Sequence, residues 1–337
     1  MIHAHSSVAS NGTGRAEDLE KGGLGVTATI PSQVLIREVG PREGFQIMTK
    51  VVETARKVEL IAALVDAGLS HVEVTSFMRQ DRVPQMADAE SLVQSLVAKA
   101  GVHYTGLYLN IAGFKRAQAT GRLDLPGWLY TSPSDSFLRR NNNSTIEKTL
   151  ESVPEWVAAF REAGRGVHGL MVSTAFGCEL EGSVSVSSVT TLVERFIAEC
   201  DKQGEHLKEV CLADTVGRGQ PTAIREAVRL IRSLGVVPSL HLHDTWGLGL
   251  TNAYAGLLEG VEIFEASVGG MGGCPFTPGA AGNVATEDLV YLCESLGIAT
   301  GIDLERCCAA AVLAEKIVGS PLPGRVYRAR RAFCDLS

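Results

Sequence analysis

The chain has 337 residues, of which 45% are hydrophobic and 20% charged, and this balance is typical of a globular protein with a large core. Its net charge of −7 argues against a nucleic-acid-binding protein, which would carry a basic face. No apolar run approaches the roughly 18 residues that span a bilayer, and no signal peptide is recognisable. The eight cysteines form no C-x-x-C pair, which indicates a cytoplasmic protein with mostly buried thiols.

Ordered structure is predicted to begin at Val34, because residues 1–32 are rich in Ser, Gly, Thr and His and have no periodicity. We expect that N-terminal extension to be disordered or loosely docked. Strands are predicted at 34–39, 71–75, 102–107, 127–130, 167–172, 209–212, 237–241 and 263–266. Helices are predicted at 53–66, 84–100, 111–120, 144–163, 185–203, 221–234, 248–259, 286–296 and 304–318. The helix at 144–163 opens with Ser144 and Glu147 in the spacing of a capping box.

This alternation predicts parallel strands joined by helical crossovers. Eight such units, with no G-x-G-x-x-G after the first strand, favour a closed (β/α)8 TIM barrel over an open sheet. We expect one catalytic barrel over residues 33–318 and a basic, solvated C-terminal tail over residues 319–337. Since the active site of such a barrel lies where its strands end, the polar residues at those ends are the candidates.

Two histidines at the end of the seventh predicted strand indicate a metal site. His241 and His243 are two residues apart, so their side chains project from the same face of the strand. Two imidazoles beside carboxylates suit a divalent metal ion. Glu43, after the first strand, and Asn283, at the end of a long loop, can add oxygen ligands. This mixed set suits Mg²⁺ or Mn²⁺, and Zn²⁺ also fits.

Other polar side chains occupy the ends or interiors of further strands. Arg42 precedes Glu43 at the predicted mouth of the barrel, and Asp214 ends the sixth strand. Glu73 lies between two valines in the second strand, where a carboxylate is costly unless it is paired. These positions make Arg42, Glu73 and Asp214 candidate catalytic residues.

A long loop from Ser267 to Asn283 contains six glycines and two prolines around Cys274. Such a stretch cannot form the interior of a helix or strand, and loops of this length are usually functional or disordered. Apolar runs flank it on both sides, which favours a mobile active-site loop. Its thiol is suited to donate or accept a proton once the loop closes.

Several motifs resemble those of one known family. They are Glu38–Gln46, Glu73–Phe77, Val83–Asp88, His241–Thr245 and Ser267–Asp288. Together they resemble 3-hydroxy-3-methylglutaryl-CoA lyase, a family of barrel metallolyases related to isopropylmalate synthase. The likeness runs from about Val34 to about Gly301, and the Gly-Gly-Cys-Pro loop with the following Gly-Asn-Val-Ala-Thr-Glu-Asp is its most specific part.

The resemblance implies metal-dependent retro-Claisen cleavage of a 3-hydroxy-3-methylglutaryl-CoA-like acyl-CoA. The products would be acetyl-CoA and a keto acid, which is acetoacetate for the parent substrate. It also implies a metal ion held by Glu43, His241, His243 and Asn283, with no redox cofactor. A homodimer is expected, because barrels of this kind commonly pair.

The same resemblance implies roles for the remaining candidates. Arg42 would stabilise the enolate of acetyl-CoA, a charge that develops mainly in the transition state. Cys274 and His241 would handle protons, and Glu73 and Asp214 would orient ligands and waters around the metal. The basic C-terminal tail is expected to be solvated rather than bound to the phosphates of CoA.

Two departures from the family pattern leave the substrate open. The usual Arg-Asp-Gly is here Arg42-Glu43-Gly44, with a carboxylate one methylene longer, and Cys211-Leu-Ala-Asp214 replaces Ser-Leu-Gly-Asp. A lyase for another branched 3-hydroxyacyl-CoA, such as citramalyl-CoA or a longer-chain 3-hydroxyglutaryl-CoA, is one alternative. A condensing enzyme or aldolase on the same barrel is another. An inactive scaffold barrel is the third, although a scaffold would need none of the candidate residues.

Overall fold

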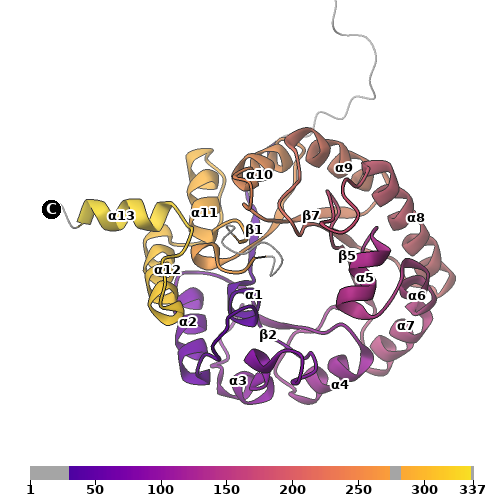
Figure 1. Cartoon of the computed structure of the whole chain (residues 1–337), viewed down its shortest axis with the longest axis horizontal. Coiled ribbons are helices and arrows are strands. Elements are labelled where there is room, and N and C mark those ends of the chain that lie inside the picture. Colours follow the sequence, from indigo (N-terminus) through magenta and orange to yellow (C-terminus); the bar gives the residue numbers. More distant parts are fainter. Residues whose placement is uncertain (1–29, 274–281, 335–337) are drawn as a thin grey trace, which may run out of the picture.

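The computed structural model describes residues 30–273 and 282–334. Its centre is a ring of eight parallel strands surrounded by helices, which confirms the predicted (β/α)8 barrel (Figure 1). The strands are β1 (Leu35–Glu38), β2 (His71–Ser76), β3 (His103–Leu107), β4 (Gly127–Thr131), β5 (Val167–Val172), β6 (Glu209–Asp214), β7 (Val237–Leu242) and β8 (Ile263–Ala266). Apolar residues of these strands, such as Val72 and Val74 of β2, are fully buried.

The helices follow the strands in chain order, and most of them form the outer layer. They are α1 (Gly40–Gln46), α2 (Thr54–Asp66), α3 (Ala89–Ser95), α4 (Ile111–Ala119), α5 (Asp135–Asn142), α6 (Ile146–Glu151), α7 (Val153–Glu162), α8 (Val186–Lys202), α9 (Pro221–Ser233), α10 (Gly249–Leu258), α11 (Thr286–Ser295), α12 (Leu304–Val318) and α13 (Val326–Cys334). Two 3₁₀ turns are η1 (Pro84–Met86) and η2 (Val268–Gly270). None of the helices in the described part of the chain is both long and apolar enough to cross a membrane.

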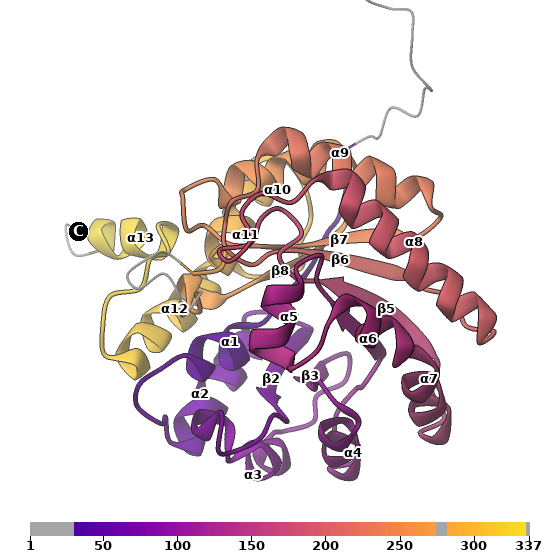
Figure 2. The ribbon, with the colours of Figure 1, turned by 45° about the vertical axis from the view of Figure 1, so that its right-hand side comes forward.

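Two of the helices that were not predicted, α1 and α5, are short and lie at the carboxyl end of the barrel. Helix α1 follows β1 directly, with Pro41 in its first turn, where a missing N–H costs nothing. Helix α5 begins where the Ser134 side chain accepts a hydrogen bond from the Phe137 N–H, and it ends at Asn143 in the left-handed conformation. Figure 2 shows α5 lying beside the strand ends, inside the line of the outer helices.

The predicted helix at 144–163 is wrong in two details. Its N-cap is Thr145, whose hydroxyl accepts a hydrogen bond from the Lys148 N–H, so Ser144 lies outside the helix. The helix is also interrupted at Ser152, which ends α6 and begins α7. Pro154 lies in the first turn of α7, and because proline has no N–H, it cannot continue the hydrogen bonding of α6. The helix predicted at 84–100 is likewise shorter, with only η1 and α3 formed.

The barrel has one seam without strand pairing. Hydrogen-bonded neighbours follow the order β3-β2-β1-β8-β7-β6-β5-β4, so no ladder joins β3 to β4. Tyr108, just after β3, bridges this seam with its side chain. Its hydroxyl donates to the Pro126 carbonyl over 2.7 Å and accepts from the Trp128 N–H over 3.2 Å. A phenol therefore supplies contacts that a strand ladder supplies elsewhere in the barrel.

The segment predicted as a solvated tail forms helix α13, which is anchored to the barrel. The Asp288 carboxylate accepts hydrogen bonds from the backbone N–H groups of Arg325 and Val326, which satisfies the start of α13. The Arg325 guanidinium donates to Asp244 over 2.8 Å, and Tyr327 is 1% exposed. The tail is therefore not wholly solvated, because it is tied to the loop that follows β7.

Candidate active site at the carboxyl end of the barrel

The strand ends bring two histidines and a carboxylate together, as the sequence predicted. The Nε2 atoms of His241, in β7, and His243, just after it, are 3.1 Å apart. The Glu43 carboxylate of α1 lies 3.6 Å from His241 Nε2 and 3.9 Å from His243 Nε2. Both imidazoles are 4% exposed. The three side chains form a candidate metal site, because one atom from each lies within 4.8 Å of the others.

Asn283 lies against the same cluster. It forms an isolated bridge with His243, and its amide nitrogen donates to Glu43 over 2.5 Å and to the Met271 carbonyl over 3.1 Å. Its side-chain oxygen is buried with no hydrogen-bond partner among the described residues. An unpartnered carbonyl oxygen beside converging imidazoles and a carboxylate fits a divalent cation, since such an oxygen is a ligand that hard divalent metals accept.

The charges of the cluster perturb one another strongly. Burial acts to raise the pKa of the Glu43 carboxyl, but Arg42 and the two histidines together hold that pKa far below its ordinary value. Burial acts to lower the pKa of His241, yet the nearby Glu43 and Glu265 carboxylates raise it to about 8. Burial and the neighbouring His241 lower the pKa of His243 to about 4. The cluster thus has an ionised carboxylate and one neutral imidazole.

Arg42 connects this cluster to Glu73. Its guanidinium lies 3.0 Å from Glu43 and donates a hydrogen bond to the Glu73 carboxylate of β2. Burial raises the pKa of Glu73 to about 7, although Arg42 opposes the shift. The carboxylate between two valines is therefore paired, as its position required. Arg42 is 8% exposed, and it is fixed in place by carboxylates on both sides.

Glu265 of β8 was missed by the sequence analysis. Its carboxylate accepts a hydrogen bond from His241 Nδ1 over 2.8 Å, and the residue is 9% exposed. In the neutral form of His241 with its proton on Nδ1, directed at Glu265, the Nε2 lone pair faces Glu43 and His243. A charged residue between apolar neighbours in a strand was the available signal, the same one that had drawn attention to Glu73.

Asp214 lies apart from the groups that line the site. Ala213 and Thr215 border a cavity of about 260 Å³ together with His241 and His243, whereas Asp214 does not. Its carboxylate instead accepts a hydrogen bond from the Gly219 N–H over 2.9 Å, within the loop that follows β6. Burial raises its pKa to about 6. Of the predicted site residues, Arg42, Glu43, His241 and His243 thus border this cavity, whereas Asp214 does not.

Cys274 lies outside the described residues. The two glycines before it are described, and they run along the metal cluster. Gly272 has a φ of +93°, and a Cβ added there would come within 2.6 Å of the Asn283 amide nitrogen. Only glycine therefore fits where the backbone passes Asn283 this closely. Gly273 borders the cavity above the cluster, so the chain enters the cysteine loop at the edge of the site.

Comparison with known proteins agrees with this geometry. The model of the HMGL-like family matches residues 33–313. The chain is 38% identical to hydroxymethylglutaryl-CoA lyase of Pseudomonas mevalonii over 83% of this chain and 90% of that protein. It is 37% identical to the human mitochondrial hydroxymethylglutaryl-CoA lyase over 84% of this chain and 85% of that protein.

Solved structures give the same result. The hydroxymethylglutaryl-CoA lyase from Pseudomonas aeruginosa superposes with a TM-score of 0.82 and 34% identity, covering 90% of this chain and 99% of that one. An HMG-CoA lyase from Acinetobacter baumannii, in complex with coenzyme A and 3-methylmalate, has a TM-score of 0.80 and 33% identity. That match covers 88% of this chain and 95% of the other.

Proposed function

Because the chain belongs to the HMGL-like lyase family, we propose that it cleaves a 3-hydroxy-3-methylglutaryl-CoA-like acyl-CoA to acetyl-CoA and a keto acid. The observation that carries the proposal is the convergence of Glu43, His241 and His243 at the barrel mouth, with the Arg42 guanidinium 3.0 Å from Glu43. A candidate metal-binding set and a fixed positive charge at one cavity support the proposal.

The reaction balances without an oxidant or reductant. The tertiary hydroxyl at C3 loses its proton and becomes the carbonyl of the keto acid. The bond between C3 and the carbon next to the thioester breaks, and its electron pair passes into an enolate of acetyl-CoA. A proton then adds to that carbon and gives acetyl-CoA.

Glu43, His241, His243 and Asn283 are the residues that would hold the metal ion, for which we propose Mg²⁺ or Mn²⁺. When bound there, the ion would supply a Lewis acid that polarises the hydroxyl oxygen of the substrate. Glu265 keeps the proton of His241 on Nδ1, so that Nε2 is free to bind. The side-chain oxygen of Asn283, which has no hydrogen-bond partner among the described residues, is available as a further ligand.

Arg42 is suited to stabilise the enolate oxygen as the carbon–carbon bond breaks. A donor fixed before the reaction stabilises developing charge without reorganising, and Arg42 is fixed by Glu43 and Glu73. Proton transfer is assigned to His241 and to Cys274, which follows the glycines at the cavity edge. Asp214 would act indirectly, by holding the loop after β6.

Release of acetyl-CoA from 3-hydroxy-3-methylglutaryl-CoA tests the proposal directly. The protein is treated with a chelator, and release is followed before and after Mg²⁺ or Mn²⁺ is restored. We expect release that depends on the metal ion. Absence of release from a protein shown to bind the metal would refute cleavage of this substrate.

A further inference from the structure

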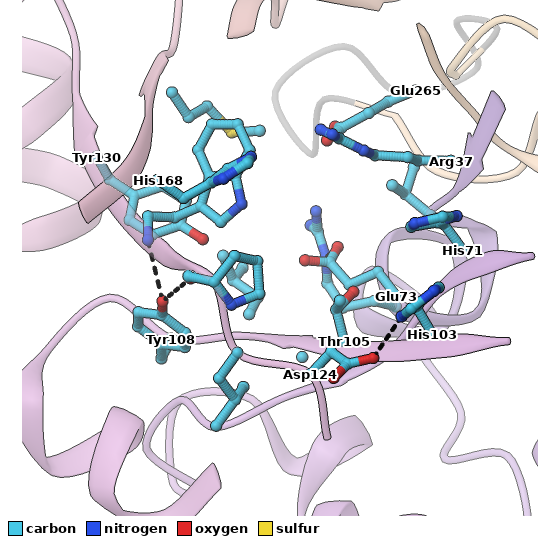
Figure 3. A pocket seen from close by; sticks show the side chains of 18 of the residues that line it. Arg37, His71, Glu73, His103, Thr105, Tyr108, Asp124, Tyr130, His168 and Glu265 are labelled. Carbon is cyan, nitrogen blue, oxygen red and sulfur yellow. Dashed lines mark hydrogen bonds and ion pairs between the residues drawn. The ribbon is translucent and has the colours of Figure 1, made fainter. Parts of the chain in front are cut away.

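A second cavity lies below the metal site, toward the amino ends of the strands. It has a volume of about 330 Å³, and residues from the starts of the strands border it, including His71, His103 and His168 (Figure 3). The interior of a TIM barrel is normally filled by layers of branched side chains. An open space of this size at that depth therefore requires an explanation.

Only one layer of side chains separates this lower cavity from the cavity at the metal site. Arg42, Leu107, Tyr130 and Met171 border both spaces. Met171 is only half-buried, and an unbranched thioether side chain adapts easily to a ligand. A group bound at the metal site therefore needs to pass only this layer to enter the lower cavity.

The two walls of the lower cavity differ in character. Figure 3 shows Tyr108 and Tyr130 on one side, and Arg37, Glu73 and Glu265 on the other. The charged groups of the second wall already have partners. The pairs are Arg37 with Glu209, Arg42 with Glu73, and Glu265 with His241. These charges therefore require no charged group from a ligand.

The first wall is mostly apolar and continues to the seam between β3 and β4; its polar exception is His168, whose imidazole lies 3.3 Å from the Glu209 carboxylate. Leu107, Leu125, Pro126 and Trp128 border the cavity together with the aromatic rings of Tyr108 and Tyr130. Burial of an alkyl chain against this wall is favourable, because binding removes apolar surface from water on both partners. Arg165, exposed at the cavity's edge, is the one charged lining residue for which the described part of the chain provides no ion pair.

We propose that the lower cavity receives the C3 substituent of the substrate, and that this substituent is an unbranched apolar chain longer than methyl. The inference rests on the proposed lyase function. The hydroxyl and carboxylate of the substrate occupy the metal site, and CoA has to leave through the open carboxyl end of the barrel because of its size. The fourth group on C3 is then directed down the barrel, past Leu107, Tyr130 and Met171.

The volume of the lower cavity limits the length of the C3 substituent. At the roughly 30 Å³ that a water molecule occupies in the liquid, about 330 Å³ corresponds to roughly ten non-hydrogen atoms. Each buried methylene is expected to raise kcat/KM by up to roughly fourfold. The lengthening of the substituent from methyl to butyl adds three methylenes, so a gain of tens of fold is expected.

The test is a series of 3-hydroxy-3-alkylglutaryl-CoA esters with methyl, butyl and hexyl groups on C3. Acetyl-CoA release is measured with the metal-loaded protein, and the hexyl-to-methyl ratio of kcat/KM is the readout. Met171→Trp fills the layer between the two cavities and should abolish the preference for long chains. Val97→Trp makes the same type of addition at a residue that is 77% exposed, outside both cavities, and should preserve the ratio. Thermal unfolding of both variants checks that they are folded.

The possible outcomes distinguish failure of the inference about the lower cavity from failure of the proposed lyase reaction. A ratio at or below one in the wild-type protein, with cleavage of the methyl ester, overturns the inference and leaves the lyase function supported. If no ester is cleaved, the dissociation constants of the same esters are measured with the metal-loaded protein, and they show whether the lower cavity receives the substituent. Affinity that rises with chain length and falls in Met171→Trp supports the lower cavity and refutes the reaction. Affinity independent of chain length overturns the inference as well.

Discussion

Replacement of Glu265 should weaken metal binding although its side chain is not one of the proposed ligands. The carboxylate accepts the Nδ1 proton of His241 over 2.8 Å, and the two residues are 9% and 4% exposed. Loss of such a partner behind a metal-binding histidine typically lowers metal affinity by about 10- to 100-fold, or about 1.4 to 2.7 kcal/mol. Glu265→Gln retains an acceptor for the proton, so we expect the lower value. Glu265→Ala leaves a buried N–H unpaired, so we expect the higher value.

Titration calorimetry of the chelator-treated protein with Mn²⁺ measures this change. An imidazole titration by NMR provides a second readout, which a merely structural role would not alter. In the metal-free Glu265→Gln protein, the pKa of His241 should fall below its value of about 8, because a carboxylate that raises it is gone. Glu259→Gln is the control, since Glu259 pairs with Arg225 and Arg229 outside the barrel. Unchanged Mn²⁺ affinity in both Glu265 variants would refute the reasoning.

Three further changes probe the site and the buried charge of helix α11. Arg42→Lys should lower kcat by roughly 10²- to 10³-fold with little change in KM, because a single ammonium cannot replace the fixed guanidinium; steady-state kinetics giving the wild-type kcat would contradict this. Cys274→Ala should retain Mn²⁺ affinity while kcat falls by roughly 10²- to 10⁴-fold, and normal turnover would rule out its role in proton transfer. Glu287 is buried, which raises its pKa from 4.5 to about 8, so the folded protein binds this proton more tightly than the unfolded chain does. Its contribution to stability should therefore be complete below about pH 4.5 and be lost as the pH rises through about 8. Urea unfolding of Glu287→Gln should show a weaker decline over that range, and an identical decline would contradict the assignment.

Local sequence patterns predicted the parts of the site that depend on a single strand. The spacing of His241 and His243 placed both imidazoles on one face, and the structure brings their Nε2 atoms within 3.1 Å. Glu73 lies between valines, where an unpaired carboxylate is costly, and it pairs with Arg42. The alternation of strands and helices was sufficient for the barrel itself. These predictions succeeded because periodicity and the cost of a buried charge are both local properties.

Contacts between strands were harder to predict. Glu265 and His241 are 24 residues apart, and they meet only because β7 and β8 are neighbours in register. Asp214 was placed correctly at the end of β6, but the sequence did not show which side of the strand faces the cavity. Helices α1 and α5 escaped detection because each has fewer than nine residues, too short for an apolar period to be recognised.

The seam between β3 and β4 has a consequence for the motions of the barrel. A closed ring of ladders opens only when many hydrogen bonds break together, whereas here the Tyr108 hydroxyl and a few neighbouring contacts close one side. The free energy of local opening is lowest where the fewest hydrogen bonds must break. The barrel should therefore open transiently at this seam before it unfolds elsewhere. Amide protons along β3 and β4 should exchange with solvent sooner than those of β6 and β7. The lower cavity borders the same seam, and transient opening there would let water enter and leave the cavity through the wall of the barrel.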